Sequence, residues 1–102
     1  MKNCKTKQEI EMKFSKEMDL ASEIERLADD LSRVANSGVE PALLVLQNSL
    51  RGDAGGSIGF AGKKTTDKIY RTADDLLRVA TSIRTTADIV YKAEKAAAGL
   101  CF

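Results

Sequence analysis

The sequence predicts an all-α protein in which two long antiparallel helices form a single helical hairpin over residues 1–102. Three observations support this prediction. The composition is rich in alanine, leucine and charged residues and poor in aromatic ones, a mixture that favours helices over sheets. Five of the seven glycines lie between Gly52 and Gly62 and divide the chain into two stretches of similar length. In the second stretch, apolar residues recur at alternating steps of four and three, which is typical of a heptad repeat.

The first helix is predicted over about residues 8–49, with a kink near Pro41. Proline lacks a backbone donor and its ring crowds the carbonyl of Ser37, so an undisturbed helix is not expected there. An apolar stripe before the proline makes this helix amphipathic. The stripe consists of Phe14, Ala21, Ile24, Leu27 or Ala28, Leu31, and Val34 or Ala35.

The turn is predicted at about residues 50–57 and the second helix at about residues 58–98. We expect Gly52 to reverse the chain, Asp53 to cap the second helix, and Leu50 to pack as the last core residue. The seam of the second helix is predicted to consist of Ile69, Ala73, Leu76, Ala80, Ile83, Ala87 and Val90. Gly55, Gly59 and Gly62 continue this seam towards the turn, where they would receive Leu43, Leu46 and Leu50 of the first helix.

A second line of residues runs beside this seam and leaves two interpretations open. It consists of Tyr70, Leu77, Arg84 and Tyr91. Two helices side by side cover only one stripe of each other, so this line is predicted to form a dimer face that joins two hairpins into a four-helix bundle. The alternative is that both tyrosine rings only widen the core within one chain.

Several classes of function are excluded or disfavoured by composition. The sequence has no histidine, and no carboxylate pair has a base, nucleophile or metal ligand set near it by spacing, so we predict no enzyme, no cofactor and no metal site. The 16 basic and 15 acidic residues nearly cancel, which disfavours nucleic acid as a partner. The longest apolar run, Pro41 to Leu46, is too short to span a membrane, so no membrane insertion is expected. The first fifteen residues contain no apolar region typical of a secretory signal peptide.

The tripeptide Leu50-Arg51-Gly52, at the hinge between two amphipathic helices, resembles the W-x-G turn of the small ESAT-like (WXG-type) proteins of bacterial type VII secretion. Leu50 stands where that family has tryptophan. Near the C-terminus, Tyr91 is followed by Glu94 at three residues, where the family's export signal has an acidic residue at four. Other residues that agree with the resemblance are Ala54, Ile58 and Phe60.

The resemblance implies a small secreted protein or secretion partner that acts by protein–protein contact. It would form a homodimer, or a heterodimer with a related hairpin or with the N-terminal helical domain of a toxin, and it would present Tyr91 and Glu94 to the type VII secretion ATPase. After synthesis in the cytoplasm it would be secreted without a signal peptide. Two alternatives remain open: a helical adaptor that guides a larger toxin to export, and a structural coiled-coil module of an unrelated assembly.

The two cysteines, Cys4 and Cys101, lie near opposite ends of the sequence. In an antiparallel hairpin that turns near residue 53, residues whose numbers add to about 106 lie side by side. The two thiols are therefore predicted to be neighbours that form a disulfide after export or oxidation. Free thiols, or a bond between the two partners of a dimer, are the alternatives.

Overall fold

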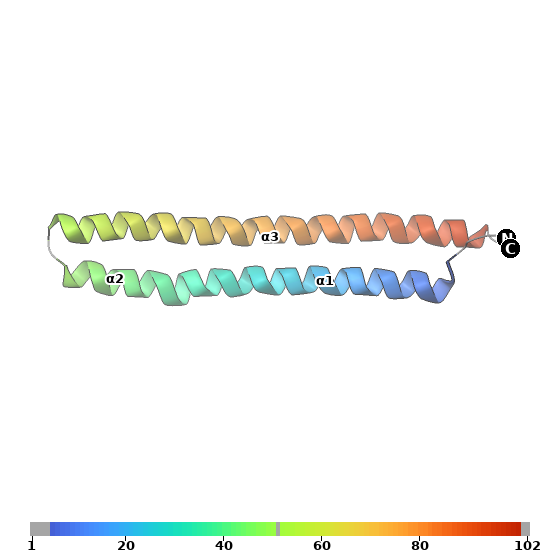
Figure 1. Cartoon of the computed structure of the whole chain (residues 1–102), viewed down its shortest axis with the longest axis horizontal. Helices are drawn as coiled ribbons and strands as arrows, with labels where there is room; N and C mark the ends of the chain where they lie inside the picture. Colours follow the sequence, from blue (N-terminus) through green and yellow to red (C-terminus); the bar gives the residue numbers. More distant parts are fainter. Residues whose placement is uncertain (1–4, 51, 101–102) are drawn as a thin grey trace. The chain divides into compact units, whose positions relative to one another are not determined.

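The computed structural model describes residues 5–50 and 52–100, and every regular element in these two ranges is a helix. The order along the chain is α1 (Lys7–Arg33), the π-helical segment η1 (Val34–Val39), α2 (Glu40–Ser49) and α3 (Asp53–Gly99), as Figure 1 shows. The prediction of an all-α protein is confirmed for this part of the chain.

The chain divides into two compact units. The terminal unit comprises the described residues of Met1–Glu25 and Arg78–Phe102, and in it the start of α1 is paired with the end of α3. The turn unit is Arg26–Leu77, and it contains the rest of α1, η1, α2 and the first half of α3.

The first helix begins with a side-chain cap in the terminal unit. The Oγ1 atom of Thr6 accepts the backbone N–H of Glu9 at 3.1 Å, and the Thr6 carbonyl accepts the N–H of Ile10 at 3.1 Å. A threonine cap satisfies one of the backbone donors that every helix leaves unpaired at its start. Thr6 is therefore a local signal for the start of α1, which begins at Lys7.

The irregularity expected at Pro41 begins upstream of it, in η1. The N–H of Glu40 donates to the carbonyl of Ala35, a five-residue step in place of the usual four. Pro41 lies in the first turn of α2, where its missing donor matters least. The wider turn adds one residue to the heptad spacing, so Leu43 rather than Ala42 follows Ala35 on the packed side of the helix.

The turn is shorter than predicted, because α3 begins at Asp53 rather than at about residue 58. Leu50 is extended (φ −106°, ψ 144°) and Gly52 has a positive φ of 71°, a conformation that glycine adopts at no steric cost. Asp53 is the first residue of α3 and not its cap. Its carboxylate lies in the first helical turn, where the helix dipole favours negative charge.

Fully buried positions carry small side chains, with Ile10 as the exception among the described residues. On α1 and η1 they recur every seventh residue, and on α3 they do the same. The buried set is Ala21, Ala28, Ala35, Thr66, Ala73, Ala80 and Ala87, each at most 4% exposed. Small side chains at this spacing let two helices approach closely along one row. Of the alternatives that the stripe left open, the structure buries Ala28 and Ala35 and leaves Leu27 and Val34 about half exposed.

Glycines extend this seam in the turn unit. A Cβ atom placed on Gly62 would lie 2.3 Å from the side chain of Leu43, and one on Gly59 would overlap the amide of Gln47. On Gly55 it would lie 3.0 Å from the carbonyl oxygen of Leu50. The predicted approach of Leu43 to Gly62 is present. At Gly55 the neighbour is the backbone of Leu50 rather than its side chain, and Gln47 takes the place expected for Leu46, which is 47% exposed.

Candidate protein-interaction site

Tyr91 lies in the terminal unit among residues from the start of α1. Its ring stacks on Phe14 with 4.3 Å between the ring centroids, and its hydroxyl donates to Oε1 of Glu11 at 2.6 Å. The ammonium of Lys95 lies 5.1 Å from the centre of the same ring and donates to the hydroxyl at 3.3 Å. These contacts raise the pKa of Lys95, chiefly through the Tyr91 hydroxyl. One of the two residues predicted as a secretion signal is thus held by contacts within its own unit.

Glu94, the other predicted signal residue, occupies a position of the α3 seam, seven residues after the buried Ala87. Its side chain is 18% exposed, and its two oxygens lie 2.8 Å from the ammonium of Lys13 and 2.7 Å from that of Lys5. The hydrogen bonds from Lys13 and then Lys5 lower the pKa of Glu94, and the same carboxylate raises the pKa of Lys13. A charge at a seam position is tolerated here because it is paired on both sides.

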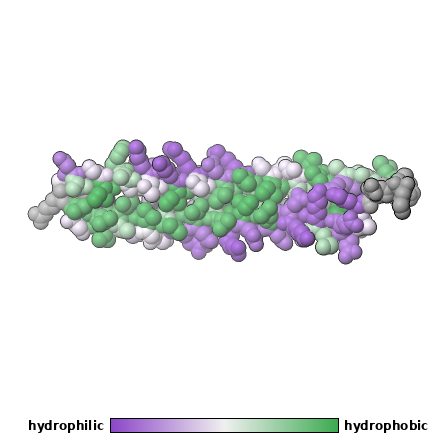
Figure 2. Space-filling model, in the orientation of Figure 1, coloured by the Kyte–Doolittle hydropathy of each residue, from purple (hydrophilic) through white to green (hydrophobic). Residues whose placement is uncertain are grey.

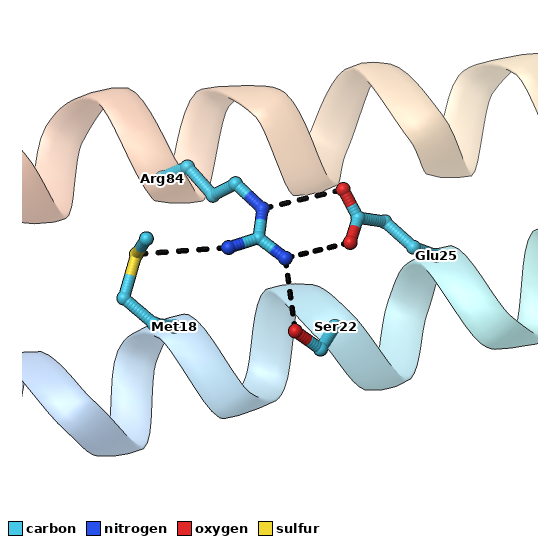
Figure 3. A network of polar contacts seen from close by, with 4 residues as sticks. All are labelled: Met18, Ser22, Glu25 and Arg84. Carbon is cyan, nitrogen blue, oxygen red and sulfur yellow. Dashed lines mark hydrogen bonds and ion pairs between the residues drawn. The ribbon is translucent and has the colours of Figure 1, made fainter.

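Arg84 makes the densest polar contacts of the terminal unit, which Figure 3 shows from close by. Its Nη2 lies 2.6 Å from Oε1 of Glu25, and its Nε donates to Oε2 at 3.2 Å, a bidentate pair. Ser22 Oγ accepts a further bond from Nη2 at 2.9 Å, and the sulfur of Met18 lies 4.0 Å from Nη1. This pairing lowers the pKa of Glu25 and raises that of Arg84. Bidentate geometry holds α1 and α3 of this unit in one register.

Tyr70, in the turn unit, is half-buried and donates its hydroxyl to Oε1 of Glu40 at 3.2 Å. Burial, followed by the nearby carboxylate, raises the pKa of this tyrosine. Three members of the line that was predicted as a dimer face are therefore engaged within their own unit, Arg84 and Tyr91 with α1 and Tyr70 with α2. Leu77, the fourth, is 44% exposed. These contacts agree with the alternative, in which both tyrosines widen the core within one chain.

Several exposed apolar side chains lie on the other side of the alanine row, while Leu44, Val45, Phe60 and Ile89 are exposed at other positions of the helices. In the turn unit, Leu27 and Val34 are 53% and 54% exposed, and Figure 2 shows apolar side chains gathered along the helices of this unit. In the terminal unit, Leu20 and Val79 are 50% and 48% exposed. An open groove of about 420 Å³ on that unit is lined by Glu17, Arg78, Val79, Ser82, Ile83 and Thr86. We call this surface the apolar side of each unit. In the terminal unit it consists of Leu20, Ile24, Val79 and Ile83, and in the turn unit it consists of Leu27, Leu31, Val34, Ile69 and Leu76.

The turn motif is described only in part. Leu50 is 38% exposed, so it is not the buried last core residue that was predicted, and Gly52 supplies the positive φ expected of it. Arg51, Cys4 and Cys101 lie outside the described residues, and the predicted disulfide lies there with them.

In residues 5–50 and 52–100, no group of three or more His, Cys, Asp or Glu side chains is placed to hold a metal ion. Within the same residues, no helix is both long enough and apolar enough to cross a membrane.

Comparison of the chain with models of protein families, with curated proteins and with solved structures finds no match in any of the three. The resemblance to the WXG-type proteins therefore stays a prediction.

The sequence reasoning missed the partners of the candidate residues. Lys5, Lys13, Glu11 and Glu25 were not singled out, although they hold Glu94, Tyr91 and Arg84. The signal was present, since the antiparallel rule applied to the cysteines also brings Tyr91 near Phe14 and Arg84 near Ser22. Applied to every charged or aromatic residue of α3, the rule would also have brought Lys13 near Glu94, whereas Lys5 lies about two helical turns from the position that the rule pairs with Glu94.

Proposed function

We propose that this protein is a helical hairpin that works by association. The apolar side of each unit packs against a second helical hairpin to form a four-helix bundle, and the protein acts by contact rather than by catalysis. The proposal is carried by the burial pattern, because the seam buries alanine and glycine while Leu20, Leu27, Val34 and Val79 stay about half exposed. Burying a fully exposed side chain of this kind contributes about 1.5–3 kcal/mol, and burying the exposed half of each contributes roughly half as much, so association over this surface is favourable.

The association is tested by placing charges on the apolar side. We expect the protein to sediment as a dimer at micromolar concentration, alone or after co-expression with its genomic neighbours. The double variant Leu27→Glu/Val34→Glu should weaken this association by roughly 100-fold or more and leave the helical circular dichroism intact, because both side chains face solvent within their own unit. Met12→Glu is the control, since Met12 is 51% exposed but lies away from the apolar side. A cooperatively melting monomer, both alone and with its neighbours, would contradict the proposal.

For the biological role, we propose a small secreted protein or secretion partner of a type VII system, with Tyr91 and Glu94 as the residues recognised for export. This rests on the resemblance of the turn and of the C-terminal segment. We expect Tyr91→Ala to abolish export from a host that carries the type VII genes. Phe14→Ala is the matched control, because it removes the same ring contact and keeps Tyr91. Normal export of Tyr91→Ala would rule out this role.

The two alternative roles, a toxin adaptor and a structural coiled-coil module, would use the same apolar side for association. A toxin adaptor would co-purify with the N-terminal helical domain of a larger neighbouring gene product and would carry it to export. A structural coiled-coil module would associate in the same way and would be indifferent to loss of the type VII ATPase. Mass measurement after co-expression, combined with export in an ATPase deletion strain, separates the three.

A further inference from the structure

Every contact described above for Tyr91 and Glu94, apart from that of Lys95, comes from one short segment of the terminal unit. We call residues Lys5–Phe14 the strap. Lys5 and Lys13 pair with the carboxylate of Glu94, Glu11 accepts the hydroxyl of Tyr91, and Phe14 covers its ring. Ile10, at 2% exposure, is the apolar anchor in the middle of the strap.

Weak contacts hold the ends of the strap. Lys5 and Lys13 are 48% and 45% exposed, and pairs of this kind contribute little in water and are screened by salt. An open hollow of about 510 Å³ lies at this end of the unit and is lined by Lys5, Thr6, Lys7, Ile10, Lys95, Ala98 and Gly99. By contrast, the part of the same unit around Ala21 and Ala80 packs through fully buried alanines and is locked by Arg84. The N-terminal end of the strap is therefore held by fewer buried contacts than the part of the unit around Ala21 and Ala80, and local opening is expected to begin there.

We propose that the strap is an autoinhibitory cover, which keeps Tyr91 and Glu94 from a recognition partner until it is displaced. This inference rests on the proposed function, in which these two residues are recognised for export. The chemistry of the strap also defines the partner. In place of the strap, the partner must supply an aromatic ring that stacks on Tyr91, an acceptor for the Tyr91 hydroxyl, and one or two cations that pair with Glu94. A helical segment that carries an aromatic residue next to lysine or arginine, with a carboxylate one turn away, meets these needs.

The test weakens the strap without touching Tyr91 or Glu94. Lys5→Glu/Lys13→Glu turns both attractive pairs with Glu94 into repulsive ones. Lys16→Glu/Arg26→Glu makes the same change of charge on two exposed basic residues of α1 that lie outside the strap, and it is the control. In the full chain, hydrogen exchange is measured at the amides of residues 91–99, and export is measured in the type VII host beside Tyr91→Ala.

If the strap covers the signal, the Lys5/Lys13 variant exchanges about tenfold faster at these amides than the control and is exported more efficiently. Equal exchange in the two variants overturns the strap itself. Faster exchange with unchanged export, while Tyr91→Ala is retained, overturns the autoinhibitory role and leaves the proposed function standing. Normal export of Tyr91→Ala instead removes the proposed function, and the exchange data then still report whether the strap opens.

Discussion

The turn unit and the terminal unit use the same heptad seam with different residues. In the turn unit, Gly55 and Gly62 are buried beside Leu50 and Leu43, so the backbone of α3 meets the opposite segment directly. In the terminal unit the seam carries Ala80 and Ala87, and then Glu94 at its end. The chemistry of the contact therefore changes from backbone contact to methyl packing to ion pairing along a single helix.

This difference predicts which substitutions each unit can tolerate. A seam of alanine or glycine has no room for a larger side chain, because the facing helix fills the space. A seam that ends in a paired carboxylate depends on charge and solvent conditions instead. Packing should dominate stability near the alanines, and electrostatics should dominate at the open end of the terminal unit.

The largest expected effect comes from filling the alanine seam. Ala80 is fully buried, so Ala80→Phe forces the two helical segments of the terminal unit apart. Overpacking of this size typically costs about 3 kcal/mol. Chemical denaturation of the full chain should show a correspondingly lower free energy of unfolding.

Ala96→Phe is the matched control for this change, because Ala96 is exposed on the same helix. It should alter the free energy of unfolding by less than about 0.5 kcal/mol. Equal losses in the two variants would show that the alanine row is not the packed seam.

The second largest effect is expected at the turn, where two adjacent glycines, Gly55 and Gly56, differ in the space that surrounds them. A Cβ atom on Gly55 would lie 3.0 Å and 3.3 Å from the backbone carbonyl oxygens of Leu50 and Gln47, whereas one on Gly56 would meet nothing within 4 Å. Gly55→Val should therefore cost about 1–2 kcal/mol. Gly56→Val should be neutral or slightly stabilising, because valine has the higher helix propensity. Thermal melts of the two variants measure the difference, and identical melting temperatures would contradict the close approach.

The fold class and the buried row of α3 were predictable from sequence, because a heptad pattern is a local property of one helix. Ala73, Ala80 and Ala87 were assigned to the seam and are buried, whereas Ile69, Leu76, Ile83 and Val90, assigned to the same seam, are only partly buried. The choice between Leu27 and Ala28 was not predictable in this way. A helix with apolar residues at both positions can turn either one inward, and only the close approach of the partner segment selects the smaller.

The position of the irregularity in the first half also depends on the partner. Pro41 signals a disturbance, but the π-helical turn of η1 lies before it and shifts the register by one residue. That shift places Leu43 against Gly62, a contact between residues on two helical segments. Polar residues on α1 carry no periodic signal of their own, so the partners of Tyr91 and Glu94 were predictable only from the antiparallel pairing of the two helices.

The smallest expected effect is an acid dependence confined to the end of the terminal unit. Lys13 and Lys5 hold the pKa of Glu94 below its ordinary value of 4.5. A carboxyl group with a lowered folded pKa stabilises the fold above its ordinary pKa, and this contribution is lost as the pH falls through the lowered value. Wild-type protein should therefore be slower than Glu94→Gln in hydrogen exchange of residues 91–99 at pH 7, and the two should converge as the pH falls below the lowered pKa of Glu94. Because Glu25, whose pKa Arg84 lowers, titrates in both proteins, the difference between them isolates Glu94.

High salt should shrink the difference in exchange rate at pH 7, because it screens the charges of Lys5 and Lys13. A difference that persists unchanged in acid would mean that Glu94 acts through packing at the seam rather than through its charge.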